Sequence, residues 1–101
     1  MIETKIKGYI SIAAKAGYVI YGTDNLNGYK KKLYLVLAQQ NSGNYLMKTA
    51  ESLKELVQNN VFYVEDMEKL TGIKNCKILG VKNKGISDEI IKLLRSENFG
   101  K

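Results

Sequence analysis

Residues 14–25 read A-K-A-G-Y-V-I-Y-G-T-D-N, and the rest of the chain is organised around this stretch. Gly17 stands where the end of a helix needs a residue in the left-handed conformation. The four residues after it combine aromatic and β-branched side chains, which favour a strand. Gly22 then precedes polar residues suited to begin a second helix, whose first N–H groups have no partner inside that helix. The stretch therefore predicts a helix end, a short strand and a second helix, with a corner between them that can bind an anion or the edge of a base.

Outward from this stretch, helical and strand patterns alternate along the chain. Residues 33–38 form a continuous apolar run, which is typical of a strand covered on both faces. Strands are expected over about 18–21, 33–38, 61–64 and 76–81, and helices up to about 16, over about 23–30, 46–58 and 65–71, and from about 87 onward. The connections are short, so helices should cover both faces of a four-stranded sheet in an α/β fold. The expected element order is α-β-α-β-α-β-α-β-α, in one domain spanning residues 1–101.

Polar residues mark the expected helix starts. Ser87 is expected to cap the last helix, with Asp88 and Glu89 in its first turn, where the helix dipole favours negative charge. Asp24 and Asp66 also stand at expected helix starts, as Asp88 does, and capping alone is enough to explain all three aspartates.

Composition is that of a globular protein, with 45% hydrophobic and 26% charged residues. No apolar run approaches the roughly 20 residues of a membrane-spanning helix, and the N-terminal residues lack the apolar segment of a signal peptide. A single cysteine, Cys76, excludes an internal disulfide and fits a reducing compartment. These features predict a soluble cytoplasmic protein without a membrane partner.

The net charge of +6 is distributed unevenly along the chain. Residues 1–35 carry a net charge of +4, residues 36–70 carry −2, and residues 71–101 carry +4. Basic ends around an acidic middle favour a protein with one cationic face and a polyanionic partner. The alternative is that the lysines only keep a small protein in solution.

The sequence offers little material for catalysis or for metal binding. Histidine is absent, which removes the commonest general base and metal ligand. Neither a P-loop nor a dinucleotide-binding pattern is present. Cys76 begins an apolar segment, so packing is a better explanation for it than nucleophilic catalysis. The chain is therefore not expected to be an enzyme, and no cofactor or metal site is expected.

Seven tyrosines stand among the lysines and allow two interpretations. They could form a stacking surface for single-stranded RNA. The favoured alternative is that they are half-buried on strands and helix faces with their hydroxyl groups in water; it applies to Tyr9, Tyr18, Tyr21, Tyr34 and Tyr63. The run of three lysines at 30–32 follows an expected helix end, where cations suit the helix dipole, and a phosphate contact is its second possible role.

Five segments carry a family resemblance: S-I-A-A-K-A-G-Y-V-I-Y-G at 11–22, L-Y-L-V-L-A at 33–38, the polar turn 40–44, L-T-G-I-K-N at 70–75 and I-L-G-V-K-N-K-G-I-S at 78–87. On these segments the chain resembles the ribosomal protein L-seven-Ae type, the kink-turn RNA-binding family, and especially its small bacterial YlxQ-like members. The resemblance covers essentially the whole chain. It implies a three-layer α/β/α sandwich on a mixed four-stranded sheet.

The resemblance implies a non-catalytic protein that binds structured RNA, ribosomal or kink-turn-like, with the ribosome as a further expected partner; a monomer is expected. In the family, a G-x-N-E-x-x-K segment opens the second helix and reads guanines of tandem sheared G·A pairs, and a later loop covers a splayed-out nucleotide. Here the first segment begins at Gly22 and the covering loop spans residues 72–77. The implied RNA-binding residues are Lys15, Gly22, Thr23, Asp24, Asn25, Lys31, Lys32, Ile73, Lys74, Asn75 and Lys77.

The guanine-reading segment departs from the family pattern at three positions. Asp24 stands at the family's Asn, Asn25 at its Glu, and Gly28 at its Lys. A carboxylate accepts hydrogen bonds from guanine but repels phosphate, so RNA affinity is expected to be weaker or tuned to a different RNA structure. The alternative is a protein-interaction module that keeps the fold and has lost RNA recognition. The altered segment and the acidic stretch 51–68 favour that alternative.

Overall fold

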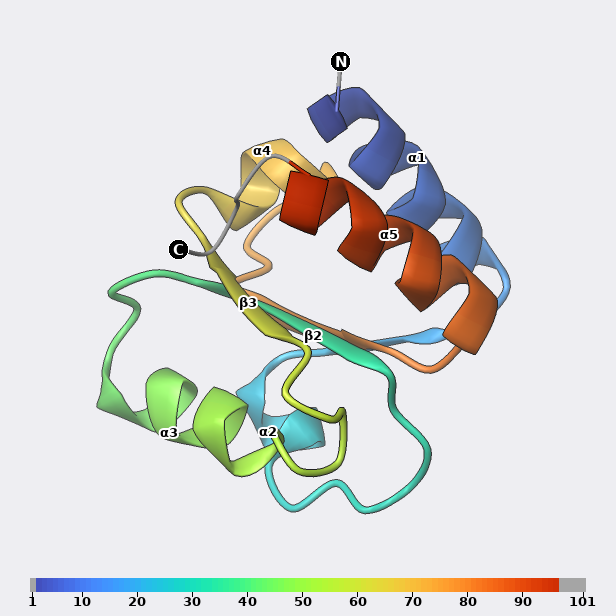
Figure 1. Cartoon of the computed structure of the whole chain (residues 1–101). Helices are drawn as coiled ribbons and strands as arrows, with labels where there is room; N and C mark the ends of the chain where they lie inside the picture. The colour runs from blue at the N-terminus through green and yellow to red at the C-terminus, as the bar shows by residue number, and fades with distance from the viewer. Residues whose placement is uncertain (1, 97–101) are drawn as a thin grey trace.

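The computed structural model describes residues 2–96, which form five helices and four strands in strict alternation (Figure 1). The elements are α1 (Ile2–Lys15), β1 (Val19–Tyr21), α2 (Thr23–Leu26), β2 (Leu35–Gln39), α3 (Asn44–Ser52), β3 (Val61–Val64), α4 (Met67–Thr71), β4 (Ile78–Val81) and α5 (Lys84–Ser96). This order confirms the one predicted from the sequence.

The four strands form one mixed sheet in the order β1-β4-β2-β3. The last strand in the chain, β4, lies in the interior and pairs antiparallel with both β1 and β2. Strand β3 pairs parallel with β2 at the other edge. Because β4 separates β1 from β2, residues far apart in the sequence become neighbours at both ends of β4.

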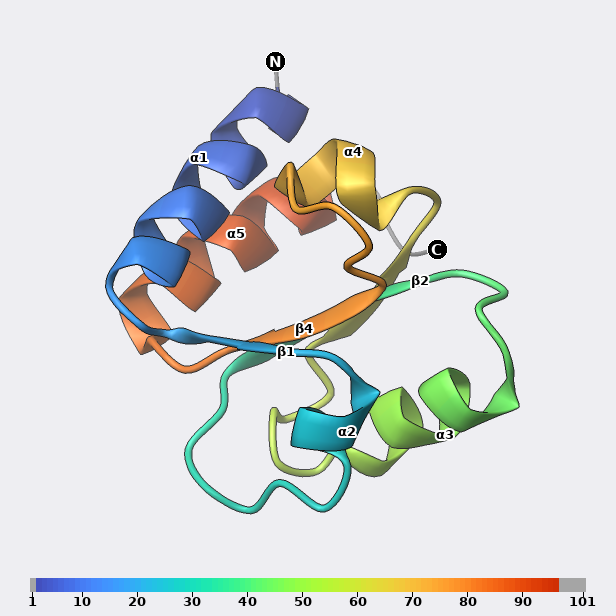
Figure 2. The same cartoon turned by 180° about the vertical axis from the view of Figure 1, so that it is seen from behind.

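Helices cover both faces of the sheet, as expected (Figures 1 and 2). Helices α1, α4 and α5 lie on one face, and α2 and α3 lie on the other. In β2, Leu35 and Leu37 pack into the core beneath the first group of helices, whereas Val36 and Ala38 pack into the second core. All four side chains are fully buried, which confirms the prediction of a strand covered on both faces.

Several helices and strands are shorter than predicted. Helix α2 ends at Leu26, because the next residue is extended and Gly28 adopts a left-handed φ of 75°. Helix α3 ends at Ser52, and residues 53–59 continue as turns although they keep the apolar spacing of a helix. Strands β2 and β4 each begin two residues later than predicted, at Leu35 and Ile78.

The predicted start of the last helix is wrong. Helix α5 begins at Lys84, and Asn83 caps it by accepting a 2.9 Å hydrogen bond from the N–H of Ile86 at Oδ1. Ser87 therefore lies inside the helix, fully buried, and its Oγ has no hydrogen-bond partner among residues 2–96. Asp88, predicted in the first turn together with Glu89, lies in the second turn and bonds to the Lys84 ammonium at 2.9 Å.

The predicted cap and end of α4 are confirmed, although the helix begins at Met67, two residues later than predicted. The Asp66 carboxylate accepts a 3.1 Å hydrogen bond from the N–H of Lys69, which caps the helix. Gly72 ends it with a left-handed φ of 74°. Met67 and Leu70 are buried in the core, as the helical spacing predicted.

Candidate nucleic-acid interface

The corner formed by residues 22–25 lies where β1 ends and α2 begins. Gly22 has a φ of 84° and a ψ of 156°, a conformation that glycine adopts without strain. Its N–H donates a 3.1 Å hydrogen bond to the carbonyl oxygen of Ile78, the first residue of β4. No side chain of the described residues caps α2, so the first N–H groups of this short helix are left for solvent or a ligand.

Of the side chains of Asp24 and Asn25 in the corner, that of Asn25 is fixed by a hydrogen bond to the backbone. Nδ2 of Asn25 donates a 2.8 Å hydrogen bond to the carbonyl oxygen of Tyr21, which ties the amide to the backbone of β1. Asp24 is exposed, and its carboxylate makes no hydrogen bond or ion pair with the described part of the chain. Since Gly22 occupies the N-cap position, capping does not explain Asp24, contrary to the prediction. The corner therefore offers acceptor oxygens to a partner.

The covering loop, residues 72–77, is held by side chains of α4. Oγ1 of Thr71 accepts a 3.1 Å hydrogen bond from the N–H of Ile73, and Oε2 of Glu68 accepts a 2.9 Å bond from the N–H of Asn75. Asn75 adopts a left-handed φ of 61°. These bonds leave the side chains of Lys74, Asn75 and Lys77 exposed, while Ile73 is half-buried against the core.

Backbone hydrogen bonds at the start of β4 connect the end of the covering loop to the sheet and to the corner. The carbonyl oxygen of Lys77 accepts a 2.8 Å hydrogen bond from the N–H of Gln39 at the end of β2, and the next carbonyl, that of Ile78, holds Gly22. In Figure 2 the loop descends from α4 to the end of β4 at which β1 turns into α2. The two segments implied by the family resemblance, which are about 50 residues apart, thus meet at one end of the sheet.

Lys15 lies beside the covering loop, because it lines the same groove as Ile73 of that loop. A groove between α1 and the end of α4 is lined by Lys15, Ile73 and Lys7 together with small residues of both helices. The aliphatic end of Lys7 lies directly over Gly72, where an added Cβ would come within 2.5 Å of Lys7 Cε. Within residues 2–96 no carboxylate lines this groove, and Lys7 and Lys15 give its lining a positive charge.

Lys31 and Lys32 lie apart from the corner and the covering loop. They precede β2, and the N–H of Tyr34 bonds to the carbonyl oxygen of Val81, the last residue of β4. The corner is at the first residue of β4, Ile78, so the two sites are separated by the length of that strand, roughly 10 Å. The implied RNA-binding residues are therefore divided between opposite ends of the sheet.

Lys7 was not predicted as a site residue, although the sequence carries a signal for it. Lys7, Ser11 and Lys15 recur at intervals of four, which places them on one face of a helix. This periodicity shows that the three residues are neighbours, but it cannot show that the loop after α4 packs beside them.

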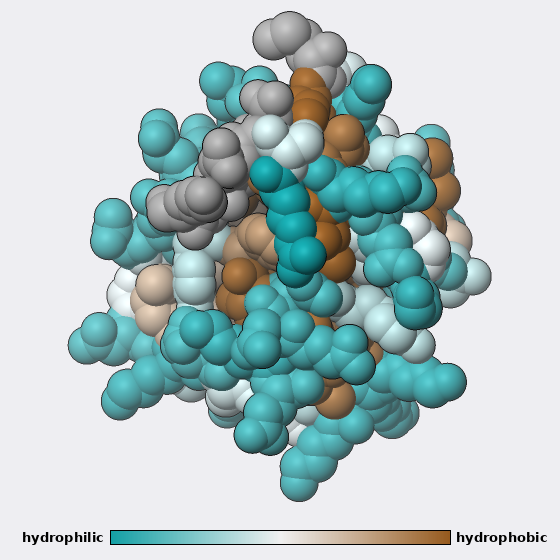
Figure 3. All heavy atoms as spheres, viewed as in Figure 1, coloured by the Kyte–Doolittle hydropathy of each residue, from teal (hydrophilic) through white to brown (hydrophobic). Residues whose placement is uncertain are grey.

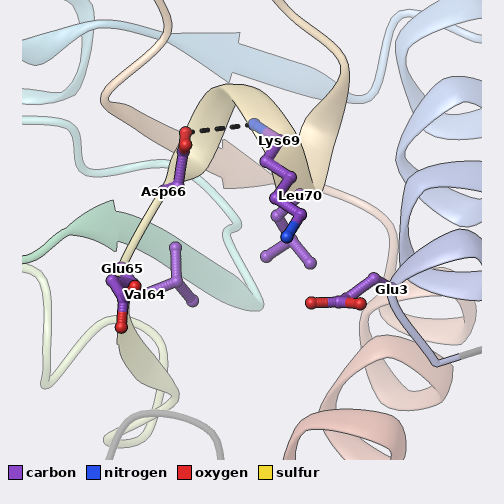
Figure 4. Close-up of a pocket in the computed structure, with 6 residues that line it drawn as sticks. All are labelled: Glu3, Val64, Glu65, Asp66, Lys69 and Leu70. Carbon is purple, nitrogen blue, oxygen red and sulfur yellow. Dashed lines mark hydrogen bonds between the residues drawn. The ribbon is translucent and has the colours of Figure 1, made fainter.

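The pocket in Figure 4 lies on the other side of α4 and has the opposite charge. Glu3 of α1 faces Glu65 and Asp66 across it, and Lys69 and the apolar residues Val64 and Leu70 complete its lining. Three carboxylates around one ammonium do not suit a polyanion. In the described part of the chain, no group of three or more His, Cys, Asp or Glu residues is placed to hold a metal ion.

Cys76 is buried beside the corner, as predicted, and burial raises the pKa of its thiol. The pKa of the neighbouring Tyr21 hydroxyl is also raised, first by burial and then by the cysteine. A protonated thiol is a poor nucleophile, so Cys76 acts here as a packing residue.

Among the predicted half-buried tyrosines, Tyr9, Tyr34 and Tyr63 are half-buried, whereas Tyr18 and Tyr21 are 38% and 39% exposed. These two tyrosines are therefore more exposed than the other three, although more than half of the surface of each is buried. Tyr18 directly precedes the edge strand β1, and Tyr21 is its last residue.

No protein-family model matches the chain, and no curated protein matches it either. Across residues 2–96, none of the helices combines the length and the apolar character needed to cross a membrane.

Proposed function

We propose that this chain is a non-catalytic RNA-binding protein that recognises a folded RNA of the kink-turn type and acts in the cytoplasm, on the ribosome or in translation. The Gly22–Ile78 hydrogen bond carries the proposal, because it holds the corner beside the residue that directly follows the covering loop. In the family that the chain resembles, these are the two segments that read the guanines and cover the splayed-out nucleotide.

The chemistry of the corner supports an RNA partner of modest affinity. The carboxylate of Asp24 faces solvent and can accept hydrogen bonds from the N–H groups of guanine. Lys74 and Lys77 are exposed on the adjoining loop and can neutralise phosphates. The negative charge of Asp24 opposes the approach of those phosphates, which is the physical reason for expecting weak binding.

Fluorescence anisotropy with a labelled kink-turn RNA tests the proposal, at low and at physiological salt. The control is the same duplex with its G·A pairs replaced by Watson–Crick pairs. We expect measurable preference for the kink-turn at low salt and a steep loss of affinity as salt rises. Equal binding of the two RNAs would contradict recognition, and tight, salt-insensitive binding would contradict the weakened corner.

A protein-interaction module on the same fold is the second candidate. The acidic pocket in Figure 4 is the observation that favours it, since three carboxylates there can face a basic partner. Absorbance of the purified protein separates the candidates at little cost. Bound nucleic acid that is released at high salt supports the RNA proposal, whereas no bound nucleic acid together with no RNA binding supports the module.

A further inference from the structure

Three neighbouring grooves meet at Leu56 on the face of the sheet that α2 and α3 cover. They separate the irregular segment 27–34 from residues 52–60 and from the start of α5. We call this concave area the Leu56 surface; the residues that line it include Tyr29, Lys30, Lys31, Lys32, Tyr34, Glu55, Leu56, Lys84 and Asp88. Lys31, Lys32 and Tyr34 lie at the end of the sheet opposite the corner. Of the guanine-reading segment, the last two residues, Asn27 and Gly28, line one of the three grooves, whereas the corner residues 22–25 line none of them.

The charge of the Leu56 surface suits a polyanion. Lys30, Lys31 and Lys32 are consecutive and exposed, and no ion pair within residues 2–96 engages them. Lys84 is paired with Asp88, but its side chain remains 71% exposed. Glu55 and Asp88 are the two carboxylates among the lining residues, so the cations outnumber them. Figure 3 shows that hydrophilic side chains gather over the lower half of the molecule, where α2 and α3 lie in the same view, with small apolar patches between them.

Two tyrosines lie among these lysines. Both Tyr29 and Tyr34 are half-buried, which leaves part of each ring accessible from the grooves. Tyr29 packs against the core beneath α2 and α3, whereas Tyr34 belongs to neither core cluster. Tyr34 lines two of the three grooves and is the tyrosine that core packing engages least, so its ring is the better candidate for stacking with a base.

We propose that the Leu56 surface binds a single-stranded segment of RNA. Lys31 and Lys32 contact its phosphates, and Tyr34 stacks with a base. The inference rests on the proposed function, since it supplies a second contact for the same RNA: the corner selects a folded element, and the Leu56 surface holds the strand that leaves it. The combination of consecutive lysines with partly open tyrosines favours single-stranded over double-stranded RNA, because bases in a duplex are not free to stack on side chains.

The test uses fluorescence anisotropy of the full chain with a labelled oligouridine of about ten nucleotides, within the usual site size of single-strand binders. Lys31→Gln with Lys32→Gln should weaken binding about tenfold at low salt and flatten the log-affinity against log-salt slope by about 1.4, or about 0.7 per phosphate contact on a single strand. Tyr34→Leu should weaken binding at least about fivefold, whereas Tyr34→Phe, which keeps the ring, should not.

Lys48→Gln with Lys69→Gln is the matched control, since it removes two exposed lysines that lie outside the Leu56 surface. An equal loss of oligouridine binding in this control would overturn the inference, because the attraction would then be the net charge alone. Absence of oligouridine binding at low salt would overturn it as well. Lys31 and Lys32 are exposed, so their replacement tests the surface even if Tyr34→Leu destabilises the fold.

Failure of the inference is distinguishable from failure of the proposed function. Lys74→Gln with Lys77→Gln should weaken kink-turn binding and leave oligouridine binding unchanged. If the kink-turn RNA does not bind but oligouridine binds through Lys31 and Lys32, the corner proposal fails and the Leu56 surface stands. If only the kink-turn RNA binds, the Leu56 surface is refuted and the corner proposal stands.

Discussion

The N–H of Gly22 and the carbonyl oxygen of Ile78 are joined by a hydrogen bond of 3.1 Å, although the two residues come from opposite halves of the chain. The bond extends the pairing of β1 with β4 by one residue, beyond Tyr21 and Leu79. It fixes the start of α2 against the end of the covering loop. The corner is therefore positioned by the sheet rather than by the short helix that follows it.

Asp24→Asn should strengthen binding to kink-turn RNA. The change removes a negative charge that faces the phosphates and adds donors, and one good bidentate base contact contributes about 1–3 kcal/mol, or at least about fivefold in affinity. Anisotropy titration measures the effect. Glu65→Gln is the control, because it removes another exposed carboxylate away from the corner; an equal gain there would show that net charge alone is responsible.

Replacing Gly28 with Lys, the residue that the family carries there, should not rescue affinity in the same way. Gly28 lies beyond the end of α2 and has a φ of 75°, which costs a residue with a Cβ about 1 kcal/mol or more.

Lys74→Gln with Lys77→Gln should flatten the salt dependence of kink-turn binding. Each phosphate contact removed lowers the slope of log affinity against log salt by about 0.7–0.9, so the double variant should lose about 1.4–1.8. The measurement is a titration at several salt concentrations. An unchanged slope would show that neither lysine contacts a phosphate of the RNA.

Gly80→Ala should destabilise the fold close to the corner. An added Cβ would lie 2.9 Å from Cδ1 of Leu33 and 3.1 Å from Cδ2 of Leu26, both buried beneath the sheet. Overpacking of this kind lowers the free energy of unfolding by about 1–3 kcal/mol. Urea denaturation measures it, with Gly8→Ala as the control: no atom lies within 4 Å of a Cβ there, so the helix should gain about 0.5–1 kcal/mol.

Two substitutions at the start of α5 should have opposite effects. Asn83→Ala removes the cap and should lower the free energy of unfolding by about 1 kcal/mol. Ser87→Ala removes a fully buried hydroxyl with no partner among the residues described, and should raise that free energy by about 1 kcal/mol. Thermal or urea unfolding of both variants checks the assignment. If Ser87→Ala were destabilising and Asn83→Ala were not, Ser87 rather than Asn83 would be the cap.

Tyr63→Phe should reduce stability in a way that depends on pH. The Tyr63 hydroxyl donates a hydrogen bond to the Glu51 carboxylate, which lowers the pKa of Glu51, and the Lys54 ammonium 3.0 Å away lowers it further. The unfolded state therefore binds a proton at higher pH than the folded state does. This contribution to stability is present above the ordinary pKa of 4.5 and is lost as the pH falls through the lowered value.

Urea unfolding at a series of pH values tests this coupling. Because Glu51 is largely exposed, Tyr63→Phe should cost no more than about 0.5–1 kcal/mol near neutral pH. The difference from the unmodified chain should shrink as the pH falls from about 6 to about 3. Tyr45→Phe, which alters an exposed tyrosine on α3, should show no such trend; a constant difference for Tyr63→Phe would exclude coupling to Glu51.

Helix and strand patterns in the sequence were enough to predict the element order and the burial of β2 on both faces. The apolar run at 33–38 predicted a strand covered on both faces, and the short connections predicted helices on both sides of a sheet. The start of α5 was mispredicted, because Ser87 and Asn83 are both good caps and only packing decides between them.

The sequence by itself determined the local elements, since periodicity records which face of a helix or strand avoids water. Tertiary structure alone decided which segments meet, because the position of β4 between β1 and β2 depends on pairing between distant strands. That pairing brings Ile78 to Gly22 and so completes the corner. The same pairing carries Lys31 and Lys32 to the far end of β4, where charge and aromatic rings form the separate Leu56 surface.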